Sequence, residues 1–146
     1  MPELTATAAL FRAYASSLEI DLGHQGFSEE LAALPGAYAQ PQGDILLAKK
    51  GDHVLGCVAL KRLEDGIAEI KRLYVRPQAR GQGVARALVA AMLAEAAKLG
   101  YGEVKLDTLP QMEGAIALYR SFGFVNVPAY GSHPYPGLVT LGKKLG

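Results

Sequence analysis

One short stretch, residues 69–88, constrains the fold more than any other because it joins a strand pattern directly to a helix pattern. Apolar residues typical of a strand run to Val75, and from Val84 onward apolar residues recur at helical spacing. Gly81 and Gly83 lie between them, and glycine lets a backbone approach a ligand closely. A helix N-terminus offers unpaired N–H groups and a partial positive charge, which together bind anions. The stretch therefore predicts a phosphate-binding loop.

Two common nucleotide-binding loops do not fit this stretch. The GxxxxGK(S/T) loop is absent, and a full GxGxxG fingerprint is absent because Arg86 fills its last glycine position. The strand is followed instead by Arg80-x-x-Gly83-x-Ala85, an R/Q-x-x-G-x-G/A loop. With the preceding residues 73–75, this loop resembles the coenzyme A pyrophosphate loop of the GNAT superfamily of N-acetyltransferases. The resemblance implies acetyl-CoA as co-substrate.

A later segment carries a second resemblance to the same superfamily. Residues 115–124 match the GNAT signature A-x-x-L-Y-x-x-x-G-F. The resemblance implies an α+β fold with a mixed, mostly antiparallel sheet flanked by helices. In that fold the sheet splays between its fourth and fifth strands to admit the cofactor. GNAT chains usually start with a strand, which residues 1–3 are too short to supply, so we expect one sheet edge to be short or covered by a partner, for example in a homodimer.

Composition and length limit the number of domains and the kinds of partner that this chain could have. A chain of 146 residues, 50% of them hydrophobic, suits a single domain spanning residues 1–146. The net charge of +1, from interspersed basic and acidic residues, gives no reason to expect nucleic acid or an anionic membrane as a partner. No stretch of about 18 apolar residues and no signal-peptide core is present, so the expectation is a soluble cytoplasmic protein.

Cysteine and histidine usage argues against a metal site. The single Cys57 lies in an apolar run, which favours a buried structural thiol over a nucleophile. The three histidines are far apart in the sequence and form no HxH or HxxxH pair. We therefore expect no metal cofactor.

The rest of the chain gives a coarse order of elements. Ser28 is expected to be the N-cap of a short helix that stops before Pro35. The other expected helices cover residues 4–19, 84–99 and 112–122. The expected strands begin at residues 45–48 and continue with residues 53–62, 67–75, 103–107, 124–128 and 138–145.

The resemblance also implies which residues hold the cofactor. In GNAT enzymes a strand bulge turns backbone N–H groups toward the thioester carbonyl and the pantetheine arm. Core packing of the side chains in this strand is compatible with that backbone role. Many GNAT enzymes have an Asn seven residues before the signature Tyr, where this chain has Met112, which leaves that contact with coenzyme A open. The implied cofactor-binding residues are Leu73, Tyr74, Val75, Arg80, Gly81, Gln82, Gly83, Val84, Ala85 and Arg86.

Tyr119 is the candidate general acid. In the family, a Tyr at this place donates its proton to the departing coenzyme A sulfur. A phenol with a pKa near 10 is protonated at neutral pH and therefore carries a proton that it can donate to the thiolate leaving group. The alternative is a ring that only packs at the rim of an amphipathic helix.

Two carboxylates compete for the role of general base. Glu69 lies four residues before Leu73, where some GNAT enzymes have a Glu base, and a regular strand would place Glu69 and Leu73 on the face opposite Arg72. Asp107 ends the expected fifth family strand and could instead bind the substrate ammonium, or cap the turn before Pro110. Glu69 is slightly favoured as the base, because desolvation in a sheet-lined cleft raises the pKa of a carboxylate.

The acceptor is not encoded in any motif. By resemblance, loop residues that border the acceptor pocket are His24, Gln25, Phe27, Tyr130 and His133, for each of which ordinary packing is the simpler role. The chain is expected to acetylate a primary amine of a small molecule. The alternatives are an acyl-CoA-binding or regulatory domain without transfer, and an acetyltransferase for protein N-termini or lysines.

Overall fold

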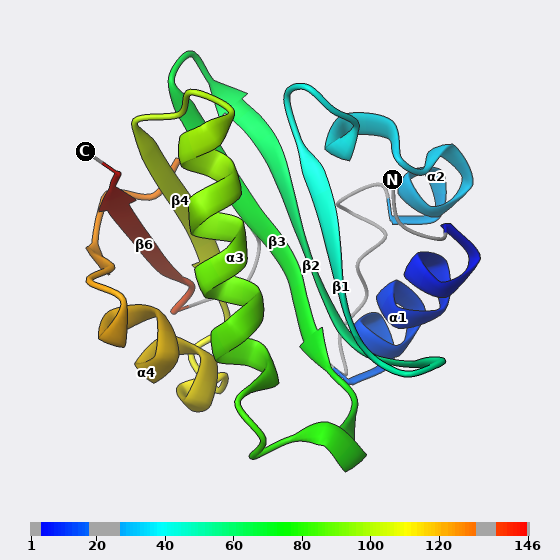
Figure 1. The fold of residues 1–146 in the computed structure, drawn as a ribbon. Helices are drawn as coiled ribbons and strands as arrows, with labels where there is room; N and C mark the ends of the chain where they lie inside the picture. The colour runs from blue at the N-terminus through cyan, green and yellow to red at the C-terminus, as the bar shows by residue number, and fades with distance from the viewer. Residues whose placement is uncertain (1–3, 18–26, 131–136, 146) are drawn as a thin grey trace.

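The computed structural model describes residues 4–17, 27–130 and 137–145, which form a mixed sheet with helices on both faces (Figure 1). The helices are α1 (Leu4–Ser17), α2 (Phe27–Ala33), α3 (Val84–Lys98) and α4 (Glu113–Ser121), with short 3₁₀ turns η2 (Gly36–Tyr38) and η3 (Pro77–Ala79). The strands are β1 (Asp44–Lys50), β2 (His53–Glu64), β3 (Ile67–Val75), β4 (Glu103–Thr108), β5 (Val125–Asn126) and β6 (Val139–Lys144).

The sheet has the strand order β1-β2-β3-β4-β6-β5, and only β3 and β4 run parallel to each other. This arrangement confirms the predicted α+β fold with a mostly antiparallel sheet. Among the described residues no strand pairs with the outer side of β1, so β1 is one edge of the sheet.

The parallel pair β3–β4 is short, and this shortness creates the space for a site. The two strands pair only from Ile67–Glu69 to Glu103–Lys105, although β3 continues to Val75 and β4 to Thr108. The sheet is therefore open at the carboxyl ends of these two strands. In α/β sheets, ligands bind at such openings beyond the ends of parallel strands.

A β-bulge interrupts β3 just before the residues expected to contact the cofactor. Val58 of β2 faces both Arg72 and Leu73, because Cys57 pairs with Tyr74 while Ala59 pairs with Lys71. Arg72 has φ +62°, a left-handed conformation that is uncommon outside glycine.

The bulge also overturns the expected alternation of side chains along β3. The extra residue moves Leu73 to the α3/α4 face, with Ile70, and sends the side chain of Arg72 to the opposite face, the side of Glu69. The regular-strand prediction was wrong because it assumed one residue opposite each partner.

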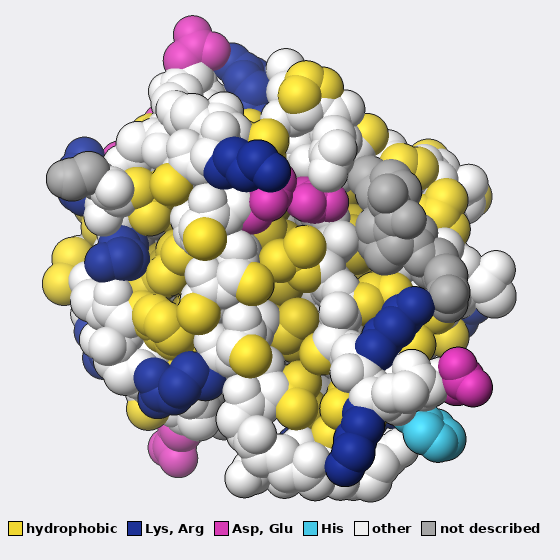
Figure 2. Space-filling view, viewed as in Figure 1, with side chains coloured by type: hydrophobic (Ala, Val, Ile, Leu, Met, Phe, Trp, Pro, Cys, Tyr) yellow, Lys and Arg dark blue, Asp and Glu magenta, His cyan; other side chains and the backbone are white. Residues whose placement is uncertain are grey.

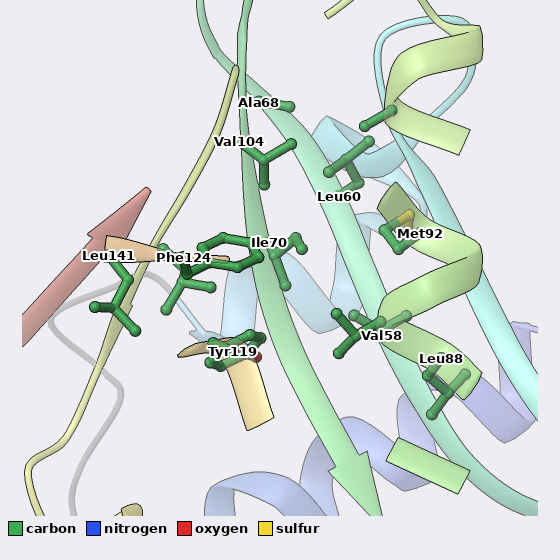
Figure 3. Packing of buried hydrophobic residues seen from close by; sticks show 13 residues of the cluster. Val58, Leu60, Ala68, Ile70, Leu88, Met92, Val104, Tyr119, Phe124 and Leu141 are labelled. Atoms are coloured by element: carbon green, nitrogen blue, oxygen red, sulfur yellow. The ribbon is translucent and has the colours of Figure 1, made fainter. Parts of the chain in front are cut away.

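Each face of the sheet has its own hydrophobic core. The larger core lies under α3 and α4, and Figure 3 shows Tyr119 and Phe124 packed together there. Their ring centroids are 5.4 Å apart. The smaller core lies under α1 and α2 and includes Phe11, Tyr38 and Cys57. The prediction of a buried thiol at Cys57 is confirmed: it is fully buried, its Sγ donates to the backbone oxygen of Arg72 at 3.2 Å, and burial raises its pKa to about 12.

Two local predictions differ from the structure. Ser28 lies inside α2, which begins at Phe27, so it is not the N-cap, and acidic residues in the first turn favour the helix start instead. β5 covers only Val125–Asn126 rather than residues 124–128, since Pro128 lacks the N–H needed to continue the ladder. No helix in the described part of the chain is long and apolar enough to cross a membrane.

Candidate active site

The glycine loop has the geometry of an anion cradle. Gly81 and Gly83 have φ values of +80° and +79°, and a Cβ added at either would meet nothing within 4 Å, so this backbone borders open space. The first hydrogen bond of α3 runs from Ala87 N–H to the Gly83 carbonyl at 3.0 Å. The N–H groups of residues 84–86 therefore precede the helical ladder and are available to an anion.

A cavity of about 420 Å³ adjoins this loop. The cavity is lined by Val75, Ala79, Arg80, Gly81, Gly83, Val84, Ala85 and Arg86, and from α4 by Gly114, Ala117 and Leu118. Most of the expected cofactor-binding residues thus meet here. Gln82 does not line the cavity, and its side-chain amide lies 3.4 Å from the Gln78 carbonyl.

The two arginines of the loop are both held in place. Arg80 donates from Nε to the Val75 carbonyl at 3.1 Å, and its guanidinium lies 5.8 Å from the Tyr74 ring centroid. Arg86 donates from Nη1 to Ser121 Oγ at 3.3 Å. Two positioned guanidinium groups at the mouth of a backbone cradle favour a polyanionic ligand such as a pyrophosphate.

The α4 wall of this cavity was missed by the sequence reading. Gly114 and Ala117 are three residues apart, so they share one face of the helix and leave room beside the loop. That pair of small residues was the available signal.

A second, smaller cavity of about 80 Å³ brings together the three catalytic candidates Glu69, Asp107 and Tyr119. It lies where β3 and β4 stop pairing. The other lining residues are Tyr14, Ile70, Lys71, Arg72, Leu73, Thr108, Met112 and Ala115. Residues far apart in the sequence therefore converge on one site.

Tyr119 lies on the buried side of α4 and is 5% exposed. Burial raises its pKa well above the usual value, with a smaller contribution from the nearby Tyr14. The phenol is therefore protonated at any working pH, but the same raised pKa makes it a weaker proton donor than an exposed phenol.

Glu69 is 6% exposed and has two polar neighbours on the α1/α2 face. Tyr130 donates its hydroxyl to Glu69 Oε2 at 2.6 Å, and Lys61 Nζ lies 3.8 Å from Oε1. These contacts with Tyr130 and Lys61 hold the buried Glu69 carboxylate in one orientation.

Asp107 sits across the opening on β4. It accepts a hydrogen bond from Thr140 Oγ1 of β6 at 2.6 Å, directly opposite in the register. This contact ties Asp107 to β6 of the sheet.

Comparison with known proteins identifies the family. Residues 8–124 match the acetyltransferase (GNAT) family. The chain belongs to the GNAT family of acetyltransferases. Among its relatives, an uncharacterized N-acetyltransferase of Schizosaccharomyces pombe is 38% identical over 133 residues, which cover 89% of this chain and 81% of the relative. The IAA acetyltransferase of Azospirillum brasilense is 36% identical over 98 residues, covering 66% and 63% of the two chains.

Solved structures agree on the GNAT fold. A GNAT-family acetyltransferase from Staphylococcus aureus superimposes with a TM-score of 0.79 at 16% identity, covering 97% of this chain and 94% of the other. A GNAT-family acetyltransferase from Elizabethkingia anophelis, solved with acetyl-CoA bound, has a TM-score of 0.61 at 20% identity, covering 70% and 76%.

This GNAT domain has a buried ion pair that the sequence reading missed. Arg72, whose side chain is 2% exposed, donates from Nε and Nη2 to the Glu30 carboxylate at 2.9 and 2.8 Å. Its guanidinium also lies 5.7 Å from the Tyr14 ring centroid and 5.4 Å from that of Phe27. The pair ties α1 and α2 to the bulge of β3. No local pattern signals it, because the partners are 42 residues apart.

The residues expected to border the acceptor pocket lie in different places. Phe27 packs in the core beneath Arg72, and Tyr130 lies over Glu69. His24, Gln25 and His133 lie outside the described residues. Met112, at the position of the family's Asn, lines the smaller cavity but has no hydrogen-bond donor to offer.

On the face in Figure 2, basic side chains alternate with neutral and acidic surface and do not gather in one patch. Within the described ranges, no group of three or more His, Cys, Asp or Glu side chains could hold a metal ion.

Proposed function

We propose that this chain transfers an acetyl group from acetyl-CoA to a primary amine of a small molecule by direct attack in a ternary complex. The observation that carries the proposal is an anion cradle together with a second cavity, also lined by β3 and α4, that collects Glu69, Asp107 and Tyr119. The open glycine backbone, the N–H groups at the start of α3 and two positioned arginines fit the pyrophosphate of coenzyme A.

Bound acetyl-CoA supplies the acetyl group as an activated thioester. The chain's own groups would do the rest. Backbone N–H groups at the β3 bulge, residues 73–75, would stabilise the oxyanion. Glu69 would take a proton from the attacking amine, and Tyr119 would donate its hydroxyl proton to the departing sulfur. Asp107 would hold the substrate ammonium before it loses that proton.

A small acceptor is favoured over a peptide. The smaller cavity is only about 80 Å³, and Glu69, which lines it, is hydrogen-bonded to Tyr130. A peptide would need an extended groove at this place.

Location and assembly are also proposals. The lone reduced Cys57 supports a cytoplasmic enzyme, and the outer edge of β1, which no described strand covers, supports a homodimer.

The direct test is a thiol-release assay with acetyl-CoA against a panel of small amines, amino acids and peptides. We expect release that depends on a small primary amine, with Tyr119→Phe as the matched low-activity control. Release only with peptides would support the protein acetyltransferase. Acetyl-CoA binding without release for any acceptor would contradict transfer and support a binding domain.

The roles of the two carboxylates can be separated by pH. Glu69→Gln should remove the acidic limb of the kcat/KM profile, because an amide cannot accept the proton. If the limb is lost in Asp107→Asn instead, the two roles are exchanged.

A further inference from the structure

Tyr130 makes a short hydrogen bond to Glu69, one of the catalytic candidates. Its hydroxyl donates to Glu69 Oε2 at 2.6 Å, across 61 positions of sequence, from the loop after β5 to the middle of β3. A loop residue that reaches a buried strand carboxylate fixes that side chain in one orientation. The contact also leaves Oε1 outside hydrogen-bond distance of Lys61, whose Nζ is 3.8 Å away.

The surroundings of Glu69 on this face are charged and mixed. Lys61 lies opposite on β2, Lys105 lies beside Glu69 on β4, and the Lys105 ammonium is 5.9 Å from the Tyr130 ring centroid. The charged and titratable groups around Glu69 include Lys61, Lys71, Arg72, Lys105, Asp107, Tyr38 and Tyr130. Tyr130 donates a hydrogen bond to Glu69.

Tyr130 remains a donor under all working conditions. Burial raises the pKa of its phenol, and the negative charges of Glu69 and Asp107 raise it further. The proton in the Tyr130–Glu69 contact therefore belongs to the phenol, and the carboxylate accepts. Such a contact stabilises the charged form of the carboxylate.

We propose that Tyr130 is a positioning residue for the general base. The hydroxyl occupies Glu69 Oε2 and fixes the orientation of the carboxylate, so that Oε1 is the oxygen left to take the proton of the amine. This inference rests on the proposed function insofar as Glu69 is the base. The contrasting role for Tyr130 is to fasten its loop to the sheet, with no effect on the charge state of Glu69.

The first experiment needs no acceptor. The full chain is prepared with ¹³C-labelled glutamate side chains. The Glu69 carboxyl signal is assigned as the one that is missing from the NMR spectrum of Glu69→Gln. The midpoint of its titration is then measured by NMR. Tyr130→Phe removes only the hydroxyl. We expect the midpoint to rise by about one pH unit, the worth of one hydrogen bond to a charged group. Tyr101→Phe is the matched control, because its hydroxyl donates to the Gln42 carbonyl, away from Glu69, and should leave the midpoint unchanged.

An unchanged or lowered midpoint in folded Tyr130→Phe would overturn the proposal and return Tyr130 to a loop-fastening role. This readout stands even if the amine screen finds no substrate, in which case the proposed function fails on its own.

The second experiment uses the amine that the screen identifies. The acidic limb of kcat/KM should move upward in Tyr130→Phe by the same amount as the NMR midpoint. In the Glu69→Gln background, Tyr130→Phe should cause no further loss, since the two residues act through one contact. A limb that does not move, or a full additional loss in the double variant, would show that Tyr130 does not act through the base.

Discussion

The two cavities are built in different ways. The larger one is formed mainly by one continuous stretch, residues 75–86, which is rich in small residues, and by Gly114, Ala117 and Leu118 of α4. The smaller one is formed by side chains from α1, β3, β4 and α4, brought together where the sheet opens. A backbone site accepts the same phosphate in many proteins, whereas a side-chain site is specific to its acceptor. The identity of the cofactor can therefore be predicted from this sequence, whereas the identity of the acceptor cannot.

The sharpest contrast between the cavities should come from Tyr119→Phe. Loss of one hydroxyl removes the proton donor but leaves the packing of the ring against Phe124. We expect kcat to fall by roughly ten- to ten-thousand-fold, while calorimetry gives an unchanged acetyl-CoA affinity. Tyr101→Phe is again the control. A kcat within about twofold of wild type would leave Tyr119 with a packing role only.

The cradle can be tested with a matched pair of glycines. Gly83 and Gly66 have φ values of +79° and +77°, and a Cβ at either meets nothing within 4 Å, so Ala at each should cost similar stability. Gly83→Ala should weaken acetyl-CoA binding about tenfold or more, through disturbed hydrogen bonds to a charged ligand. Gly66→Ala, in the β2–β3 turn, should not change binding. Equal affinities for the two variants would argue against the loop as the phosphate site.

A smaller effect is expected on the acceptor side. Asp107→Asn keeps the hydrogen bond from Thr140 but removes a negative charge from the smaller cavity. We expect KM for the amine to rise about tenfold, with little change in acetyl-CoA affinity. A change in acetyl-CoA affinity instead would contradict the proposal that the larger cavity binds acetyl-CoA and the smaller cavity binds the amine.

The least effect should come from Cys57. Its thiol is buried beneath the bulge with a pKa raised to about 12, so it is protonated at pH values where the enzyme works. Cys57→Ala should keep kcat within about twofold, and the native thiol should resist thiol reagents at pH 8 that modify it in urea. Rapid modification of the native protein with loss of activity would contradict a purely structural role.

The difference between a site built from one continuous stretch and a site built from distant residues also explains what could be predicted from the sequence. The loop around Gly83 and the segment around Tyr119 are local patterns, so their elements and places in the fold could be foreseen. The β3 bulge could not, because it depends on pairing with Val58 of another strand. The contacts Arg72–Glu30 and Tyr130–Glu69 likewise join residues 42 and 61 positions apart, and no periodicity records such distances.

Amide hydrogen exchange of the full chain with and without coenzyme A tests the central claim most directly. The claim is that backbone N–H groups of residues 81–86 hold the pyrophosphate. We predict slower exchange for these amides and for the end of β3 on binding, and no change in the β1–β2 turn at Gly51. Saturated binding, shown by calorimetry, with unchanged exchange over residues 81–86 would contradict the account.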